Sequence, residues 1–208
     1  MKWMLAAGAL AILGGFALGS DPPPDAAIVI AQKTSKIEFH ASATFMKVNG
    51  IFHEWQANLK MPSGKLDDAS LDMEIQAASV KTGSGMKDKE VKGRKFFDVE
   101  AHPTIRFVST RVMAGPDPDR YLMDGDLTLR GVTKPVSVIL SLEPEEDGHQ
   151  RLLGDCEFNR REFGMVHNVP FNKVADKVGV KFEFDIVPAA PAAAASGTAR
   201  EKFAVAVP

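Results

Sequence analysis

Apolar and polar residues alternate along most of this chain, which is the pattern of strands with one buried face. In residues 36–45 the apolar side of the alternation is formed by Ile37, Phe39, Ala41, Ala43 and Phe45. Comparable alternation returns in residues 71–77, 105–109, 121–130, 136–142, 152–158 and 178–186. Residues 28–31 are a short apolar run, and residues 51–61 follow a turn or bulge at Asn49 and Gly50. The pattern predicts eight or nine antiparallel strands in a barrel or a sandwich.

One short helix interrupts the strands. Ser84 is placed to cap a helix over residues 86–92, and Gly93 is placed to end it. Further on, Pro103 excludes helix and pushes His102 toward extended backbone. Residues 95–110 are therefore expected to join a helical lid to the wall of the barrel.

The two ends of the chain differ from the middle. Lys2 precedes an apolar run at residues 4–18 that ends in small residues, which is typical of a signal peptide cleaved before Ser20. This run is shorter than the roughly 20 residues of a spanning helix, so we favour cleavage over a membrane anchor. We therefore expect a signal peptide at 1–19, a proline-rich linker at 20–26, one domain at 27–187 and a disordered Pro/Ala-rich tail at 188–208.

Composition argues against several classes of partner. The chain has 25 Lys and Arg and 27 Asp and Glu, interspersed, with a formal net charge of -2. Because there is no chain-wide basic field, we do not expect a nucleic-acid partner. The single cysteine, Cys156, excludes an intramolecular disulfide, so the apolar core must stabilise the fold alone.

No catalytic constellation stands out. The histidines lack the spacing of metal sites, so we expect no metal, and they are His40, His53, His102, His149 and His167. No pair of carboxylates stands out as acid and base. Cys156 shares a strand face with Leu152 and Phe158, which predicts a buried small hydrophobe rather than a nucleophile. The sequence therefore does not indicate an enzyme.

Residues 87–95 hold five basic and two acidic side chains. One interpretation is a solvated helix face. The other is a basic rim that meets an anionic head group at a cavity mouth or at a membrane surface.

The interior of such a barrel is either filled by its own side chains or left open for one ligand. Small residues at inward positions favour a cavity, and they are Ala41, Ala43, Ala77 and Gly125. In a cavity, each buried CH2 of a ligand contributes about 0.8 kcal/mol, so a hydrocarbon chain needs no polar contact.

Three motifs appear in a characteristic order: FFD at 96–98, P-x-I-x-F-x-S at 103–109 and GDLTLRGVTKPV at 125–136. With SVKTG at 79–83, Asn159-Arg160 and Phe163-Gly164, they give residues 28–187 a pattern that resembles the YceI family. The resemblance implies a lipocalin-like antiparallel barrel of about eight strands, with the short helix at its mouth. It also implies a periplasmic protein that binds a polyisoprenoid lipid or an isoprenoid quinone in an elongated pocket, without catalysis and without a further cofactor.

Strand parity and the predicted lid suggest candidate ligand-binding residues. We expect these to face inward: Phe39, Phe45, Leu71, Met73, Ile75, Ile105, Phe107, Leu127, Leu129, Val138, Leu140, Phe182 and Phe184. We expect these at the mouth and lid: Phe52, Trp55, Met86, Val91, Phe96 and Phe97. Arg160 is expected to form a structural ion pair, with Asp98 as the suggested partner.

The function that these expectations favour is binding, transport or storage of a long-chain isoprenoid in the periplasm, with transient contact at a membrane surface. Two alternatives remain at this point. One is an interaction module with a filled barrel, whose basic segment docks a partner protein. The other is a lipid-modifying enzyme that uses Cys156 or a histidine.

Overall fold

The computed structural model describes residues 28–115, 117–145, 148–167 and 173–188. The predicted signal peptide, the proline-rich linker and the tail beyond residue 188 lie outside these ranges, so the structure does not test them. The strands are β1 (Ile28–Ile30), β2 (Lys36–Ala43), β3 (Met46–Phe52), β4 (Trp55–Lys60), β5 (Ser70–Gln76), β6 (Val80–Lys81), β7 (Thr104–Ala114), β8 (Arg120–Leu129), β9 (Val132–Pro144), β10 (Gln150–Asn159) and β11 (Val174–Pro188). The helical elements are α1 (Gly85–Lys92) and the short turns η1 (Leu66–Asp68), η2 (Ala77–Ser79) and η4 (Arg160–Phe163).

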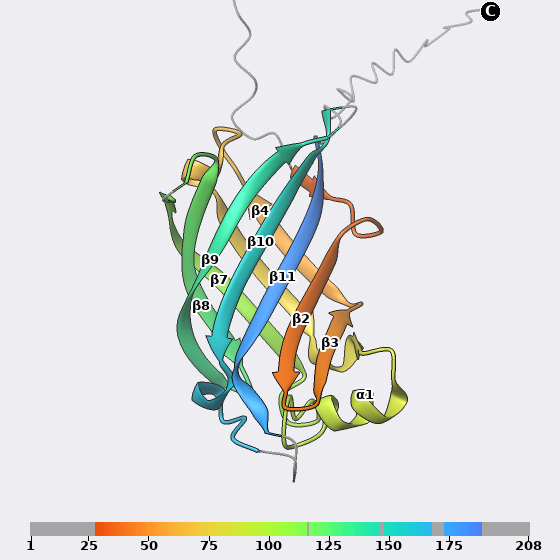
Figure 1. Ribbon diagram of the computed structural model, residues 1–208. Coiled ribbons are helices and arrows are strands. Elements are labelled where there is room, and N and C mark those ends of the chain that lie inside the picture. Colours follow the sequence, from red (N-terminus) through yellow and green to blue (C-terminus); the bar gives the residue numbers. More distant parts are fainter. Residues whose placement is uncertain (1–27, 116, 146–147, 168–172, 189–208) are drawn as a thin grey trace, which may run out of the picture.

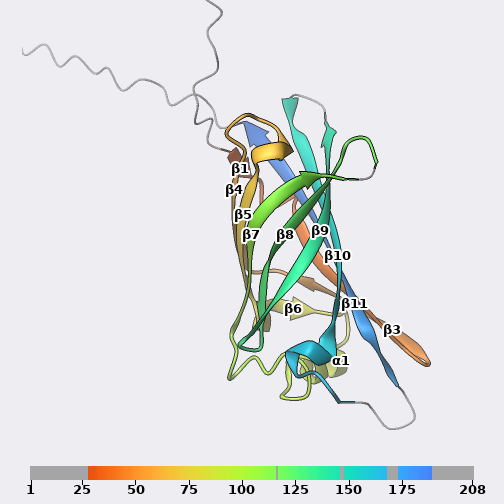
Figure 2. The same ribbon diagram turned by 90° about the vertical axis from the view of Figure 1, so that its left-hand side faces the viewer.

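These strands form one sheet of eleven strands in the order β4-β5-β7-β8-β9-β10-β11-β2-β3-β6, with β1 paired to β11. The ladders are antiparallel, and the sheet curls strongly around its apolar face (Figures 1 and 2). Gln32 follows β1, and its side chain donates to the carbonyl oxygen of Trp55 at 3.0 Å. Because β1 pairs with β11 and Trp55 begins β4, this hydrogen bond connects the two sides of the curled sheet. The all-β antiparallel barrel with one short helix at its mouth is therefore confirmed.

The mouth is the lower end of the barrel in Figure 1. There α1 lies beside the β2–β3 hairpin, and η4 follows the end of β10. The helix begins at Gly85, one residue before its predicted start, and the Gly93 N–H donates to the Glu90 carbonyl at its end.

The strand boundaries differ from the prediction around residue 50. Gly50 lies inside β3 rather than in a turn, and the stretch predicted as one strand over 51–61 is broken at His53 and Glu54. The hairpin turn falls at Thr44 and Phe45, where Ala43 pairs with Met46. The inward prediction for Phe45 is therefore wrong, because the side chain leaves the strand alternation and is 78% exposed.

Phenyl rings lie over glycines on neighbouring strands at three places in the wall. A Cβ at Gly50 would come within 2.3 Å of the Phe39 ring, one at Gly125 within 2.5 Å of Phe107, and one at Gly154 within 2.1 Å of Phe182. Phe39 pairs directly with Gly50, and Phe182 with Gly154. Each ring occupies the space that a side chain would fill, so it packs against the backbone of the wall.

Apolar side chains fill the half of the barrel away from the mouth. The Trp55 ring stacks on Phe184 with centroids 5.0 Å apart, and Phe184 stacks on Phe182 at 4.6 Å. Leu71, Leu140, Leu152 and Phe184 are completely or almost completely buried. Trp55 is therefore a core residue, and its predicted place at the mouth is wrong.

Candidate ligand-binding cavity

The cavity nearest the mouth, which we call the outer cavity, has a volume of about 120 Å³. Its walls come from the β2–β3 hairpin, from α1 and the segment after it, from the end of β10 and from the start of β11. They include Ala43, Met46, Val91, Phe96, Met165 and Val174. Lys87 and Glu90 supply charged side chains at the α1 side of this cavity.

A second cavity of about 60 Å³, the inner cavity, lies deeper in the barrel. Its lining includes Ile37, Met73, Ile105, Leu127, Val138 and Phe182. Four residues line both cavities, namely Phe39, Phe97, Phe158 and Val178. The two cavities therefore adjoin, with only side chains between them.

Aromatic rings form the boundary between the cavities. The Phe97 ring meets Phe39 edge to face at 5.7 Å and lies 5.8 Å from Phe52. Phe39 and Phe52 are 6.0 Å apart. These separations are typical of favourable aromatic pairs. The stretch at residues 95–97 thus reaches from the lid into the barrel.

The helix α1 is fastened to the wall by Asp88. Its carboxylate accepts hydrogen bonds from the Thr82 N–H and the Thr82 hydroxyl, both at 2.7 Å, and Lys81 lies 3.8 Å away. The Thr82 donors hold the pKa of Asp88 below its ordinary value, because they stabilise the carboxylate form. The Phe97 N–H also donates to the Val91 carbonyl at 2.9 Å, which fixes the lid segment to the helix.

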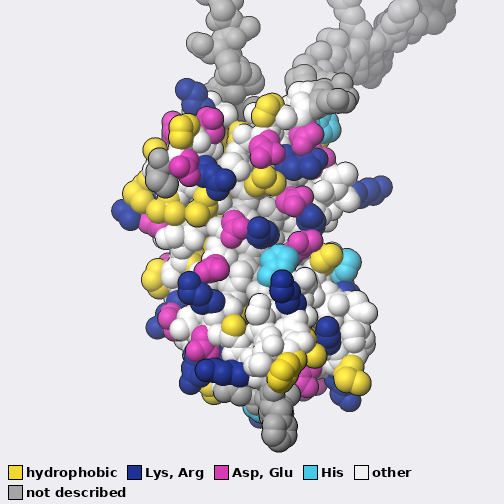
Figure 3. Space-filling view, viewed as in Figure 1, with side chains coloured by type: hydrophobic (Ala, Val, Ile, Leu, Met, Phe, Trp, Pro, Cys, Tyr) yellow, Lys and Arg dark blue, Asp and Glu magenta, His cyan; other side chains and the backbone are white. Residues whose placement is uncertain are grey.

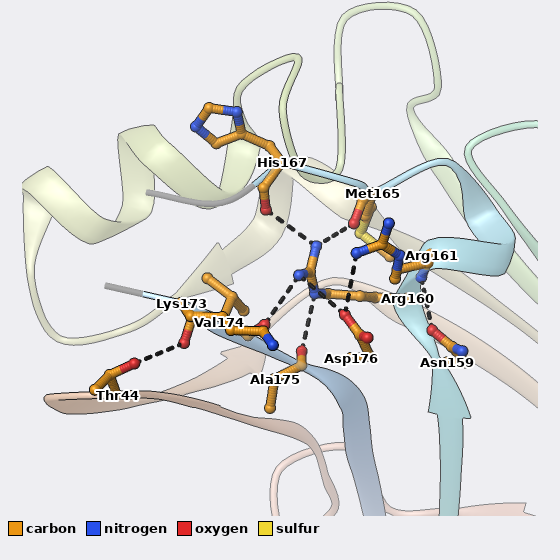
Figure 4. Close-up of polar contacts among 10 residues, drawn as sticks. All are labelled: Thr44, Asn159, Arg160, Arg161, Met165, His167, Lys173, Val174, Ala175 and Asp176. Carbon is orange, nitrogen blue, oxygen red and sulfur yellow. Dashed lines mark hydrogen bonds and ion pairs between the residues drawn. The ribbon is translucent and has the colours of Figure 1, made fainter. Parts of the chain in front are cut away.

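Arg160 braces the other side of the mouth, as Figure 4 shows. Its side chain is 1% exposed and donates to backbone carbonyls of the segment that follows η4 and of the start of β11. The acceptors are the carbonyls of Met165, His167 (3.1 Å), Val174 (3.0 Å) and Ala175 (2.9 Å). The expected ion pair exists, but its carboxylate is Asp176 at 3.3 Å rather than Asp98.

The hairpin tip is tied to the same region. The Thr44 N–H donates to the Lys173 carbonyl at 3.0 Å, and the Thr44 hydroxyl donates to the same oxygen at 3.4 Å (Figure 4). The β2–β3 hairpin and the start of β11 therefore form one connected rim.

The motif at 125–136 is bonded to the segment that follows α1. Arg130 and Gly131 both have positive φ, 52° and 71°, in the two-residue turn between β8 and β9. This turn lets the Arg130 guanidinium donate to the carbonyls of Arg94 (2.9 Å) and Phe96. The motif therefore has a structural role at the mouth.

Most of the predicted ligand-binding residues line one or both cavities. They are Phe39, Phe52, Met73, Ile75, Val91, Phe96, Phe97, Ile105, Phe107, Leu127, Leu129, Val138 and Phe182. The lining of these two cavities does not include Phe45, Trp55, Leu71, Met86, Leu140 and Phe184. Met86 lies on α1 at the mouth, but its side chain is exposed to solvent.

Sequence reasoning missed part of the lining. Phe158, Val178 and Val180 carry the alternation signal of their strands but are not among the residues predicted to contact the ligand. Met46, Val48 and Met165 line the outer cavity from a hairpin and a loop, where alternation gives no guidance. Their position depends on the tertiary contacts of the rim.

Cys156 faces the inner cavity, as its strand parity indicates. Burial, with a contribution from Asp155, raises the pKa of its thiol to about 12. At neutral pH the thiol is therefore protonated and a poor nucleophile. Within the ranges that the structure describes, no group of three or more His, Cys, Asp or Glu side chains is placed to hold a metal ion. No helix in those ranges is long and apolar enough to cross a membrane.

The fold and the cavities define a class, the small antiparallel barrel with an apolar lumen that opens at one end. A family model described as YceI-like domain matches residues 29–186. The chain belongs to the YceI family. Curated relatives include a UPF0312 protein of Pseudomonas savastanoi pv. phaseolicola, 28% identical over 141 residues that cover 65% of this chain and 72% of the relative.

Solved structures show the same fold. BcnA of Burkholderia cenocepacia superposes with a TM-score of 0.67 and 24% identity, covering 76% of this chain and 99% of BcnA. A domain from Saccharophagus degradans, described as polyisoprenoid-binding and implicated in plant cell wall breakdown, superposes with a TM-score of 0.60 and 12% identity. That match covers 78% of this chain and 98% of the domain.

Proposed function

We propose that this protein binds a long-chain isoprenoid lipid or an isoprenoid quinone inside its barrel and carries or stores it in the periplasm. The observation that carries the proposal is the pair of adjoining cavities, of which the inner is lined by apolar side chains and the outer mainly by apolar ones. The Saccharophagus degradans domain of the same fold, described as polyisoprenoid-binding, supports the same ligand class.

The interior suits a ligand that is selected by shape and apolarity. In the described part of the chain, no buried side-chain nitrogen or oxygen lacks a hydrogen-bond partner. No buried side-chain polar group there needs a hydrogen-bond partner from the ligand, and each CH2 that a hydrocarbon chain buries contributes about 0.8 kcal/mol.

A long ligand must also extend through both cavities. With volumes of about 120 and 60 Å³, neither holds a long isoprenoid on its own. We propose that the chain enters past α1 and displaces the Phe97 ring from its contacts with Phe39 and Phe52. The bound chain then runs continuously from the outer cavity into the inner one.

The alternatives are less well supported. A filled barrel that only docks a partner does not account for the two cavities. Catalysis by Cys156 would require a thiolate, and the raised pKa of this thiol opposes its formation. We therefore propose binding without reaction.

Mass spectrometry tests the proposal. The protein is produced with its own leader in a related bacterium, purified, extracted with organic solvent and analysed for lipid. We expect an isoprenoid lipid near one molecule per chain. Returning that lipid to delipidated protein at 100 times its Kd is expected to add about 2.7 kcal/mol to the free energy of unfolding. Protein that yields no lipid and is not stabilised by isoprenoids contradicts the proposal.

A further inference from the structure

Large exposed apolar side chains gather around the mouth of the outer cavity. Met86 is 86% exposed, Met46 is 45% exposed and Val166 is 57% exposed, and the exposed Phe45 precedes Met46 in the hairpin turn. They come from α1, the β2–β3 hairpin and the segment after η4. Met46 also lines the outer cavity, so the exposed apolar surface continues into the barrel.

The two ends of the barrel differ in net charge, basic at the mouth and acidic at the opposite end. The segments around the mouth, residues 44–47, 84–104, 129–134, 157–167 and 173–177, contain twelve Lys and Arg against seven Asp and Glu, a net charge of +5. The whole chain has a formal net charge of -2. The connections at the opposite end, residues 31–35, 61–70, 115–120 and 143–150 without the undescribed 116, 146 and 147, contain three basic and six acidic side chains.

The basic and apolar side chains at the mouth are neighbours. Lys47 follows Met46 at the start of β3, and Lys87 and Lys89 follow Met86 on α1. Figure 3 shows hydrophobic side chains next to Lys and Arg at this lower end of the molecule. Apolar tips surrounded by cations are typical of surfaces that lie in the interfacial region of an anionic bilayer.

The rim that carries these side chains is braced. Thr44 is bonded to the Lys173 carbonyl, and Arg160 holds four carbonyls of the segment that contains Val166 and the start of β11. A braced rim lowers the conformational entropy lost when the apolar tips enter a membrane.

We propose that the mouth docks on the surface of an anionic lipid bilayer, with Met46 and Met86 among the acyl chains and Lys47, Lys87 and Lys89 at the phosphates. In this orientation the outer cavity faces the hydrocarbon of the bilayer, and a lipid chain passes into the barrel without crossing water. The consequence for lipid transfer rests on the proposed function, but docking itself is measured without any bound isoprenoid.

Vesicle flotation tests the docking. Delipidated protein that lacks only the expected signal peptide, residues 20–208, is mixed with vesicles. The vesicles contain either phosphatidylglycerol and phosphatidylethanolamine or phosphatidylcholine alone. We expect binding to the anionic vesicles that weakens at high salt, because the cationic contribution is screened. Equal binding to both kinds of vesicle, or no binding to either, overturns the proposal.

Two sets of variants locate the contact. The triple variant Lys47→Gln, Lys87→Gln and Lys89→Gln is expected to weaken binding at least about tenfold, since each cation near an anionic surface contributes about 1 kcal/mol. Its control is Lys33→Gln, Lys60→Gln and Lys65→Gln, which removes the same charge from exposed lysines elsewhere. The apolar pair Met46→Ser and Met86→Ser is likewise expected to weaken binding, and its control is Met113→Ser and Ile139→Ser, also exposed apolar residues.

The results separate docking from lipid storage. Mouth variants that bind like the wild type, or control variants that lose binding equally, overturn the docking surface even if the protein yields an isoprenoid on extraction. Docking that depends on the mouth residues supports the inference even if no isoprenoid is extracted, in which case the proposed function fails alone. A mouth that captures a protein but does not bind vesicles also overturns it.

Discussion

Arg160 shows how one side chain determines the shape of the mouth. Its guanidinium is buried, yet its hydrogen bonds go mainly to backbone carbonyls, and its carboxylate partner Asp176 is 44% exposed. A planar group with five donors suits such a cluster of acceptors, whereas an ammonium group cannot reach them all.

Both Arg160→Ala and Arg160→Lys are therefore expected to lower the free energy of unfolding, by about 3 kcal/mol for the alanine variant, because several carbonyls lose their donor. Asp176→Ala is expected to have a small effect, and a double-mutant cycle should give a coupling below about 1 kcal/mol for such a solvent-screened pair. Urea unfolding of the wild type, the three single variants and the double variant Arg160→Ala, Asp176→Ala measures these values. A coupling of several kcal/mol would show that the ion pair, rather than the carbonyls, holds the rim.

At this scale, the sequence predicts which face a residue occupies but not its depth. Phe182 and Phe184 share a strand face, and so do Val138 and Leu140. The first of each pair lines the inner cavity, while the second is packed in the far half of the barrel. Strand alternation has no information about position along the barrel axis, because depth depends on how neighbouring strands are staggered.

At the scale of elements, α1 is fastened to the chain after β6 by the hydrogen bonds between Asp88 and Thr82. Because the folded state lowers the pKa of Asp88, its carboxylate contributes stability above its unfolded pKa. That contribution is lost as the pH falls through the lowered folded value. Acid is therefore expected to loosen the lid from the wall.

The variant Asp88→Asn tests this attachment. We expect it to be less stable than the wild type at pH 7, with the difference shrinking below about pH 4 as the wild-type carboxyl becomes protonated. Hydrogen exchange of the α1 amides, measured at pH 7 and again below about pH 4, localises the effect. Glu90→Gln, on the same helix, is the control. If the difference between Asp88→Asn and the wild type did not change with pH, the carboxylate would not be the fastening group.

Elements with local signals were predicted well. Ser84 and Gly93 flank the helix as predicted, to within one residue, although the Ser84 side chain makes no capping hydrogen bond. The short strands β1 and β6 lack such signals, because each is defined by pairing with a strand distant in the sequence. The division of residues 51–61 between β3 and β4 is likewise set by different partners, β2 and β6 for the former and β5 for the latter.

For the whole molecule, the decisive property is an interior that is not completely filled. Because Phe39, Phe107 and Phe182 each lie over a glycine of a neighbouring strand, these large rings can lie along the wall. The sequence offered small residues and large ones on the same faces, and their volumes alone did not decide between a core and a cavity. That outcome depends on which ring meets which glycine across the sheet.

The variant Gly154→Ala is expected to turn the Phe182 ring into the inner cavity, since the new Cβ would lie 2.1 Å from the ring. Such overpacking costs about 1–3 kcal/mol of stability, and we also expect less lipid per chain on extraction. Gly179→Ala is the matched control, because a Cβ there is no closer than 4.0 Å to His40. A Gly154→Ala protein with undiminished lipid content would show that the chain does not reach the inner cavity.

The adjoining cavities beside Phe39 and Phe97 also affect how the protein responds to compression. Unfolding an empty barrel lets water occupy these voids, so the unfolded chain and its solvent take up less space than the folded chain. A barrel already occupied by hydrocarbon has less void to eliminate. Hydrostatic pressure therefore favours unfolding of the empty protein over unfolding of the loaded one.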